Sequence, residues 1–455
     1  MGQDLRQNTR RLILMLAVAG WTLQLPTQGL AQDLTIDLAD AFARAQKYGA
    51  QIETANIAAA LAREDHAQAK AATLPSVNGF NQFIYTQANG TASGVFVAND
   101  GVHVYSEQLQ VHEELLALAR RGEVRVAAAA AAVARAKADV AARGLKLTVV
   151  QDYYAIAVAG RRVSNGERSL GEARQFLDIT QKQERGGEAA HADVIKAQLQ
   201  VRQRERDVQD AQLALQKTKI ALAVLMFPAL RVDYSIVDDL ARITSLPPLP
   251  EATVQAHANN PEVRAAQAGV SQARLGVTVA KYAYLPSLGL DFFYGINANQ
   301  FAARTDYATP ESGRSTQPDF LVPYRQNLGY SAQATLNIPL WNWGATHSKV
   351  KQASLKTHQA ELDLTVAQRQ LEADLASSYQ EAQAAFTQVE SLRSSSDLAA
   401  ESLRLTLLRY QAGEATALEV VDAQSTASLS RSAYDDGLVR YRVSRAAVES
   451  LTGVL

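Results

Sequence analysis

The chain of 455 residues contains no cysteine, and this absence excludes several kinds of site. Disulfide bonds, metal sites with thiolate ligands and a lipid attached to an N-terminal cysteine all require one. The 45 lysine and arginine residues are balanced by 46 acidic residues, so the chain offers nucleic acid no excess of positive charge. We therefore expect a protein without disulfides, without thiolate metal sites and without a nucleic-acid partner.

Proline is also scarce, with 12 residues in the whole chain. Proline breaks helices, and none occurs between residues 113 and 184, a stretch rich in alanine. At ~1.5 Å per residue, the helical arms that end near Gly187 and Gly413 would each be on the order of 100 Å long. No single globular core needs a helix of that length.

A run of about 20 apolar residues, long enough for a transmembrane helix, is missing beyond the N-terminal segment. The N-terminal segment itself has the features of an export signal. Arg10 and Arg11 precede an apolar stretch, and Gly29-Leu-Ala31 forms a cleavage site of the small-x-small type. We predict that residues 1–31 are a signal peptide and that the remaining chain is exported.

The sequence does contain an internal repeat. Residues 187–198 align with residues 413–424, because both segments begin with Gly-Glu-Ala, carry an acidic residue six positions after the glycine and end with Ala-Gln. Glycine commonly ends a helix in the left-handed conformation, and an acidic residue suits the first turn of the following helix. Each copy therefore predicts a tight turn between two helices.

Behind each turn, mostly apolar residues recur every seven positions. This spacing is typical of a coiled-coil seam. The positions are Val194, Val201, Val208, Leu215 and Leu222 in the first copy, and Val420, Ala427, Tyr434, Tyr441 and Val448 in the second.

The repeat extends over half the chain, since a predicted helix over about residues 34–72 leads to Leu74-Pro-Ser and a predicted helix over about residues 251–284 leads to Leu285-Pro-Ser. We predict two structural repeats, residues 32–245 and 246–455, related by internal pseudo-symmetry. Each repeat would contain a helix, two strands and long helices. The strands fall within about residues 77–111 and 287–340, and the fold class is mostly α with a small antiparallel β part.

The clearest predicted strand covers residues 327–340. Apolar or small residues at even positions from Leu328 to Ile338 alternate with polar or small residues, which is the pattern of a transmembrane β-barrel strand. Trp341 and Trp343 follow directly, where an aromatic girdle would lie. A soluble sheet predicts the same alternation, but the export signal favours the barrel.

Four strands cannot close a barrel, and lipid does not tolerate an open sheet edge. Other chains must therefore complete the sheet. A barrel of about 8 strands is filled by its own side chains, so three copies with 12 strands form the smallest open assembly that we expect. This reasoning favours an assembly of three copies whose barrel is in contact with lipid.

Several motifs, taken in order, resemble the TolC-type outer-membrane efflux protein family over the whole mature chain. They are Pro261-Glu-Val-Arg264, the paired Leu-Pro-Ser segments, Ile338-Pro-Leu-Trp-Asn-Trp-Gly344, and Arg409-Tyr-Gln-Ala-Gly413 leading to Glu419-Val-Val-Asp422. The resemblance implies a homotrimer with a β-barrel in the outer membrane and a long α-helical coiled-coil barrel in the periplasm. It also implies docking onto a periplasmic adaptor (membrane fusion) protein and an inner-membrane pump or ABC transporter.

The resemblance also assigns roles to particular residues. Asp193 and Tyr410 match a pair that locks neighbouring helices at the closed aperture, and Glu419 and Asp422 match acidic positions of the narrowest ring. Ala415 is a departure, because an efflux member of the family has a locking arginine there. We expect the turns, with Gly187, Glu188, Gly413 and Glu414, to be the surface on which the adaptor docks.

The resemblance implies the exit duct of a tripartite efflux or type I secretion system, and two other classes of protein are the alternatives to it. An enzyme is disfavoured: His112-Glu113 begins like a zinc-protease helix, but Leu116 stands where the second histidine must be. The 7 histidines are scattered, and no cofactor motif occurs, so we expect neither catalysis nor a cofactor. A periplasmic coiled-coil tether without channel activity is the alternative function; it explains the heptads and the export signal but not the strand pairs.

Overall fold

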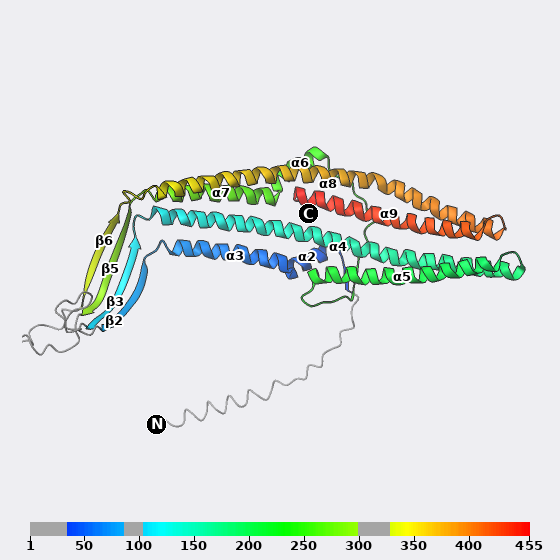
Figure 1. The fold of residues 1–455 in the computed structure, drawn as a ribbon, viewed down its shortest axis with the longest axis horizontal. Coiled ribbons are helices and arrows are strands. Elements are labelled where there is room, and N and C mark those ends of the chain that lie inside the picture. The colour runs from blue at the N-terminus through cyan, green and yellow to red at the C-terminus, as the bar shows by residue number, and fades with distance from the viewer. Residues whose placement is uncertain (1–33, 86–102, 299–327) are drawn as a thin grey trace, which may run out of the picture.

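The computed structural model describes residues 34–85, 103–298 and 328–455. The predicted signal peptide and the parts of the predicted strand regions at residues 86–102 and 299–327 lie outside these residues. The described chain is elongated, with a four-stranded sheet at one end and helix hairpins at the other (Figure 1). Within the described ranges, none of the helices combines the length and hydropathy needed to cross a bilayer.

The helices and strands follow one another in the same order in the two halves of the chain. The first half contains α2 (Leu38–Tyr48), α3 (Ala50–Ala71), β2 (Ser76–Tyr85), β3 (His103–Glu114), α4 (Leu118–Gly186) and α5 (His191–Met226). The second half contains α6 (Leu249–Asn259), α7 (Pro261–Tyr282), β5 (Ser287–Ala298), β6 (Leu328–Asn337), α8 (Ala345–Gln411) and α9 (Ala417–Thr452). Both halves thus have helices of 11, 22 and 36 residues, with a long helix of 69 residues in one and 67 in the other.

The sequence predicted one continuous helix over about residues 34–72, and this prediction is wrong. The chain begins with β1 (Leu34–Ile36), which pairs in parallel with β4 (Tyr234–Ile236). Asp37 then caps α2 by accepting a hydrogen bond from the Asp40 amide at 2.7 Å. The helix stops at Gly49, where an added Cβ would lie 2.5 Å from the Ala45 carbonyl oxygen.

The predicted helix over about residues 251–284 is also interrupted. Proline cannot donate a backbone hydrogen bond, and it disfavours helical geometry in the residue before it. Pro261 therefore starts α7 instead of continuing α6. Asn260 caps α7 by accepting hydrogen bonds from the amides of Glu262 and Val263 at 2.9 and 3.0 Å.

The four long strands form one antiparallel sheet in the order β2-β3-β5-β6. Its central pair joins the two halves of the chain, because β3 aligns with β5 in a register that places Val111 opposite Phe292. Within each half the hairpin partners are adjacent, as predicted. Strands β2 and β6 are the two edges of the described sheet.

The register gathers apolar residues on one face of the sheet. This apolar face contains Val77, Phe83, Leu109, Val111, Leu288, Leu290, Phe292, Tyr294, Ile296, Tyr330, Ala332, Ala334 and Leu336, with Asn81, Glu107 and Glu113 among the polar exceptions. The other face contains Ser76, Asn78, Gln82, Ser106, Gln108, Gln110, His112, Asp291, Ser331, Gln333, Thr335 and Asn337, with Phe80 and Phe293 as apolar exceptions. Tyr330 and Leu336 are 77% and 57% exposed in the single chain, so part of the apolar face lacks cover.

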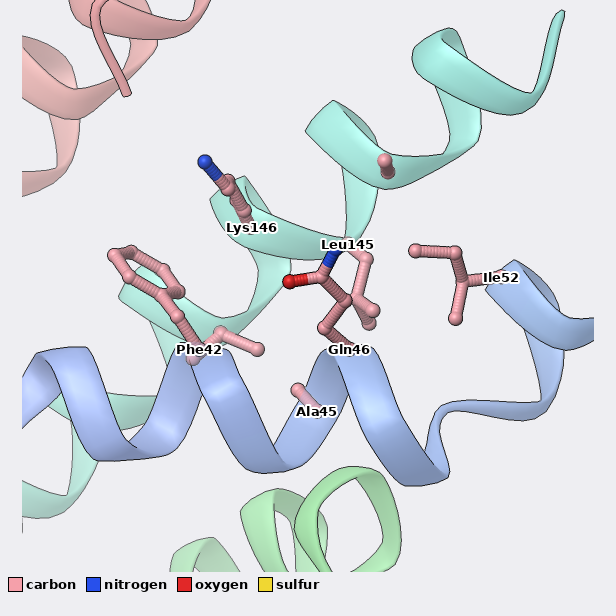
Figure 2. A pocket seen from close by; sticks show the side chains of 8 residues that line it. Phe42, Ala45, Gln46, Ile52, Leu145 and Lys146 are labelled. Atoms are coloured by element: carbon pink, nitrogen blue, oxygen red, sulfur yellow. The ribbon is translucent and has the colours of Figure 1, made fainter. Parts of the chain in front are cut away.

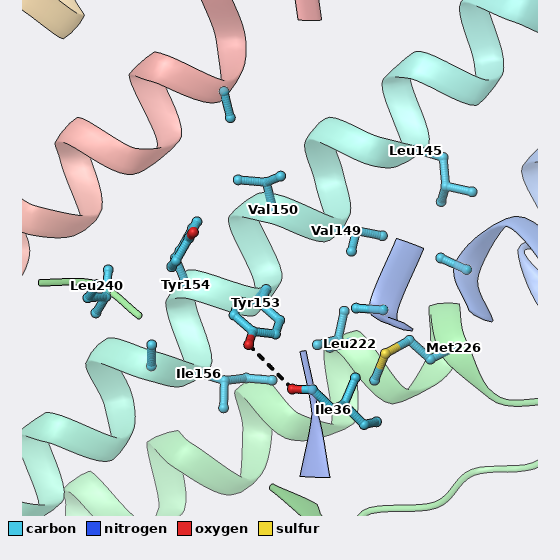
Figure 3. Packing of buried hydrophobic residues seen from close by; sticks show 14 of the residues in the cluster. Ile36, Leu145, Val149, Val150, Tyr153, Tyr154, Ile156, Leu222, Met226 and Leu240 are labelled. Atoms are coloured by element: carbon cyan, nitrogen blue, oxygen red, sulfur yellow. Dashed lines mark hydrogen bonds between the residues drawn. The ribbon is translucent and has the colours of Figure 1, made fainter. Parts of the chain in front are cut away.

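The largest buried cluster lies where α4, α5 and α9 meet the short β1–β4 pair (Figure 3). Tyr153 of α4 ties this region together, because its hydroxyl donates to the Val237 carbonyl at 2.7 Å and also contacts the Ile36 carbonyl at 3.3 Å. Burial raises the pKa of Tyr153 to about 12 and also raises the pKa values of Tyr154 and Tyr234. The phenols are therefore neutral in the folded core at physiological pH.

The segment between β4 and α6, residues 237–248, contacts three of the long helices. Arg161 of α4 binds Asp238 at 2.6 Å, and Arg442 of α9 binds Asp239. The hydroxyl of Tyr379 in α8 donates to the Pro247 carbonyl at 3.0 Å. This connection therefore holds helices from both halves of the chain.

The heptad positions predicted behind the turns are confirmed by burial. Val194, Val201, Val208 and Leu222 are buried in α5, and Leu215 is partly buried. In α9, Val420, Ala427, Tyr441 and Val448 are buried, and Tyr434 is partly buried. Helices α4 and α5 thus pair in one hairpin, and α8 and α9 pair in the other (Figure 1).

Candidate functional site at the helical tips

The first turn forms a left-handed helix end at Gly187, whose φ is +80°. The Glu188 amide donates to the Gln183 carbonyl at 2.8 Å. This bond spans five residues, where an α-helical bond spans four, and it ends α4. Helix α5 begins at His191 without a side-chain cap, because the methyl side chain of Ala190 has no oxygen. The side chain of His191 instead contacts Glu184 at 2.6 Å and braces the turn.

The second turn has the same backbone conformation as the first, but the helix that follows it is capped differently. Gly413 has a φ of +75°, and the Glu414 amide donates to the Arg409 carbonyl at 2.8 Å. Thr416 and Glu419 form a capping box at the start of α9, in which the Glu419 amide donates to Thr416 Oγ1 at 3.3 Å and the Thr416 amide donates to Glu419 Oε1 at 3.2 Å. Glu419 therefore stabilises the end of its own helix.

Four helices meet just behind the two turns. The buried cluster contains Phe176 of α4, Ala197 of α5, Tyr410 of α8, and Ala417 and Val420 of α9. Ala415 packs partly buried against this cluster. At the position where the resemblance implied a locking arginine, the chain therefore makes an apolar contact.

Tyr410 is buried at the centre of this cluster and is 5% exposed. Its hydroxyl donates to Thr180 Oγ1 at 3.2 Å, and its ring packs edge-on against Phe176 with centroids 5.1 Å apart. Its carbonyl accepts a hydrogen bond from the Gln183 side chain at 3.1 Å. Tyr410 thus joins α8 to α4 within one chain.

Asp193 and Tyr410 line the same groove between the two turns, which has a volume of about 700 Å³. Among the hydrogen bonds of the described residues, none joins Asp193 to Tyr410. Asp193 contacts Lys196 one turn along α5 at 3.5 Å, and Tyr410 contacts Thr180. The structure therefore brings the two predicted residues to one groove without forming a direct pair.

The two predicted ring residues lie on the exposed side of α9. Glu419 is held by the capping box and lies 3.7 Å from Arg409, whereas Asp422 is exposed and has no ion-pair partner among the described residues. Val420 is fully buried between them, as expected for the packed side of the helix. Glu188 and Glu414 are exposed at the turns.

Sequence reasoning missed the contribution of α4 to this site. Ser169, Ala173, Phe176, Thr180 and Gln183 follow the alternating spacing of four and three residues that marks a coiled-coil seam, and the first four are buried. This spacing was present in the sequence. It was hard to recognise because three of the five residues are polar.

A second polar contact joins α4 to α9 further from the turns. Arg431 of α9, which is 8% exposed, binds Glu172 of α4 at 2.7 Å, and the Gln424 side chain donates to the Glu172 carbonyl at 3.2 Å. Arg161 and Asn165 of α4 both bind Asp435 of α9, at 3.1 and 2.7 Å. The contact between the two hairpins therefore contains polar pairs in addition to the apolar clusters that they share.

The described residues offer little for a metal or a small ligand elsewhere. They contain no group of three or more metal-ligating side chains. His112 lies in a strand and contacts Asp291 on the neighbouring strand at 2.6 Å. A cavity between α2 and α4, lined by Phe42, Gln46, Leu145 and Lys146 among others, has a volume of about 20 Å³ and could hold about one water molecule (Figure 2).

Comparison with known proteins connects this fold to one class. Residues 252–454 match the family "Outer membrane efflux protein". A comparison with curated proteins finds no match.

Solved outer-membrane channels have the same fold. The CmeC outer membrane channel of Campylobacter jejuni superposes with a TM-score of 0.75 at 15% identity, covering 92% of this chain and 85% of that one. VceC of Vibrio cholerae gives 0.73 at 17% identity, covering 91% and 96%, and the open MtrE channel of Neisseria gonorrhoeae gives 0.72 at 18% identity, covering 91% and 88%.

Helix hairpins joined to a sheet with one apolar face thus define an outer-membrane channel fold of the TolC type. The second half of the chain matches the outer membrane efflux protein family, and the described chain shares the fold of solved outer-membrane channels. The predicted resemblance and the predicted fold class are confirmed. The limits of the two repeats and the roles of the tip residues stay predictions.

Proposed function

We propose that the protein is the outer-membrane exit duct of a tripartite efflux or type I secretion system. The observation that carries this proposal is the sheet at one end of the molecule, whose register places apolar residues on one face and polar residues on the other. A barrel strand in lipid needs this division, with the apolar face toward lipid and the polar face toward a water-filled lumen. The family match supports the same function.

A single chain would be an incomplete barrel. Edge strands β2 and β6 each have one neighbour within the described sheet, and backbone groups in lipid must all be paired. Pairing β6 of one copy with β2 of the next closes a ring, and three copies supply 12 strands. We therefore propose a homotrimer in the outer membrane with its helical barrel in the periplasm.

Cell fractionation combined with planar-bilayer recording tests this function against the periplasmic tether. The full-length chain should be found in the outer membrane as trimers whose gel mobility changes on heating, and the purified trimers should conduct ions. A protein found only in the soluble periplasmic fraction, with no conductance after addition to bilayers, would support the tether.

The tips are proposed to dock a periplasmic adaptor that links the duct to an inner-membrane pump or ABC transporter. The two turns expose Gly187, Glu188, Gly413 and Glu414 at the end of the molecule opposite the sheet. The groove between them has a volume of about 700 Å³. No catalytic step or cofactor is part of this function.

We further propose that Asp193, Tyr410, Glu419 and Asp422 belong to the aperture. In a trimer, each acidic residue would occur three times around one axis. Like charges about 6 Å apart repel by roughly 0.7 kcal/mol in water and by about 3 kcal/mol at an effective dielectric constant of 20, so such a ring would favour cations. Contacts such as Tyr410 to Thr180 would hold the helices together against this repulsion.

Planar-bilayer selectivity tests the acidic ring. Glu419→Gln combined with Asp422→Asn removes both charges, and glutamine can still complete the capping box with Thr416. We expect lower cation selectivity and weaker block by trivalent cations, with unchanged trimer assembly. The matched control is Glu64→Gln with Asp65→Asn, two exposed acids on α3 near the sheet. If the tip variant keeps the selectivity of the wild type, the acids are only helix-end charges.

A further inference from the structure

The junction between β6 and α8 exposes a compact aromatic and apolar segment. Trp341 and Trp343 are 77% and 89% exposed, and their rings pack edge-on with centroids 5.8 Å apart. Trp343 has a φ of +53°, a left-handed conformation that is uncommon for a bulky residue. The chain thus accepts backbone strain at a position where two large rings have almost no cover within the described chain.

The other three sheet–helix junctions expose apolar residues at the same level. Leu74 lies between α3 and β2, Leu116 between β3 and α4, and Leu285 between α7 and β5, and they are 64%, 48% and 43% exposed. Leu340, next to the tryptophans, is 88% exposed. These residues lie between the sheet and the helices, and we name them, with Trp341 and Trp343, the junction belt.

Basic residues lie directly on the helical side of the junction belt. Lys70 and Lys281 lie in the last turns of α3 and α7, where the helix dipole favours a positive charge. Arg121 and Lys349 lie in the first two turns of α4 and α8, where the dipole favours a negative charge, and neither helix has an acidic residue in its first turn. Local helix stability therefore does not explain Arg121 and Lys349.

These charges are also available to a partner. Lys70, Arg121, Lys281 and Lys349 are exposed and form no ion pair with any described residue. The first sixteen residues of α8, 345–360, contain three lysines and no acidic residue. At ~1.5 Å per residue, Lys349 lies about 6 Å along α8 from its start, comparable with the thickness of one headgroup layer.

We propose that the junction belt and these basic residues form a binding surface for anionic phospholipid headgroups in the inner leaflet of the outer membrane. Tryptophan rings and leucines would sit at the boundary between acyl chains and headgroups, and the basic side chains would contact phosphates just below it. The surface would fix the depth of the barrel in the membrane. This inference rests on the proposed function, because it requires the sheet to be in the bilayer.

The tryptophans themselves provide the measurement. The chain has 3 tryptophans, and Trp21 lies in the predicted signal peptide, so Trp341 and Trp343 carry the fluorescence of the exported protein. In nanodiscs, energy transfer from these tryptophans to dansyl-labelled phosphatidylglycerol should exceed transfer to dansyl-labelled phosphatidylcholine, and added salt should reduce the difference.

Charge removal then tests the basic residues. In Arg121→Gln/Lys281→Gln/Lys349→Gln, the preference for phosphatidylglycerol should fall by roughly fivefold per residue removed. The control Lys137→Gln/Arg168→Gln/Lys217→Gln removes equal charge from exposed positions away from the junction and should keep the preference.

Three outcomes would overturn the inference, and they separate it from the proposed function. Equal transfer to the two lipids in the wild type, or an undiminished preference in the junction variant, overturns the lipid surface alone, because the barrel is still inserted. Failure of the wild type to insert into bilayers of either lipid overturns the proposed function and this inference with it.

Discussion

Tyr410 contacts three residues of the neighbouring helix α4 at the tips. Its hydroxyl reaches Thr180, its carbonyl accepts from Gln183, and its ring packs against Phe176. A buried hydrogen bond of this kind contributes about 1 kcal/mol to the association of two helices. In a trimer the same contact would occur three times, so a small change at one residue would act on the whole aperture.

We predict that Tyr410→Phe raises the conductance of the closed channel. The substitution removes the hydroxyl but keeps the ring against Phe176, and Thr180 can still donate to the Phe176 carbonyl at 2.9 Å. Thr180→Val should have a similar effect because it removes the other partner. Single-channel recording of both variants and the double variant measures the coupling, and additive effects of the two changes would contradict a direct latch.

Tyr153 leads to a prediction about alkaline pH. Burial raises the pKa of Tyr153 to about 12, from a value of 10.0 for an exposed tyrosine. The folded state therefore holds the proton more tightly, so the contribution to stability is complete below pH 10 and is lost as the pH rises through about 12. The shift corresponds to roughly 2–3 kcal/mol, and burial raises the pKa values of Tyr154, Tyr234 and Tyr441 in the same region.

The measurement is urea unfolding followed by helical circular dichroism at pH 7 and pH 11. The wild type should lose stability at the higher pH. Tyr153→Phe loses the hydrogen bond to Val237 and should be less stable by about 1 kcal/mol at pH 7, but its further loss at pH 11 should be smaller. An equal loss in the two proteins would show that Tyr153 does not carry the effect.

At the scale of the secondary-structure elements, the two tips share a backbone but not a cap. Both turns use a glycine with positive φ, at Gly187 and Gly413. Only the second turn has a capping box, through Thr416 and Glu419. Since an N-cap is worth about 1 kcal/mol, we expect the start of α5 to fray more easily than the start of α9.

We predict that Gly187→Val with Gly413→Val abolishes export while leaving trimers in the membrane. Nothing lies within 4 Å of a Cβ added at either glycine, so the damage comes from the backbone conformation, which a β-branched residue rarely adopts. Export assays and trimer content of the outer membrane provide the two measurements. Asparagine tolerates this conformation, so Gly187→Asn with Gly413→Asn should retain export.

A control lies next to the first turn. Gly186 has an ordinary helical conformation with room for a side chain, and Gly186→Ala should therefore leave export unchanged. Normal export from the double valine variant would place adaptor docking elsewhere on the helical body.

At the scale of the whole molecule, the two helix hairpins contact each other through apolar clusters and through polar pairs. Phe176 of α4 packs with Tyr410 of α8 and Val420 of α9, and α4 also contacts α9 through Glu172–Arg431 and Arg161–Asp435. Arg431 and Asp435 are buried, and breaking a buried ion pair leaves an uncompensated charge. These pairs therefore resist separation of the two hairpins.

Trimer closure leads to the last prediction, which compares neighbouring residues on opposite faces of β6. Ala332 lies on the apolar face and Gln333 on the polar face, near the middle of the strand. Ala332→Arg should cost about 2–4 kcal/mol in the bilayer and reduce the amount of membrane-inserted trimer, whereas Gln333→Arg should be tolerated in the lumen. The amount of heat-modifiable trimer in outer membranes measures both, and equal insertion would mean that the apolar face does not contact lipid.

The sequence by itself determined those features that depend on local spacing. Heptads of apolar residues, glycine at the two turns and alternation in β6 each fix a periodicity or a backbone conformation within a few residues, so the long helices, the turns and the sheet faces were predictable. The helix breaks at Gly49 and Asn260 also depend on nearby residues. They were not predicted, because alanine-rich helical patterns lie on both sides of each break.

Tertiary structure decided which residues meet across long separations. The contacts of Tyr410 with Thr180, Arg431 with Glu172 and Asp239 with Arg442 join positions more than 200 residues apart, and no periodicity in either segment specifies the partner. The parallel pairing of β1 with β4 is of the same kind, because strands of three residues have no recognisable pattern of their own. Such contacts form because the helix hairpins bring these side chains together, and only the packed fold determines that arrangement.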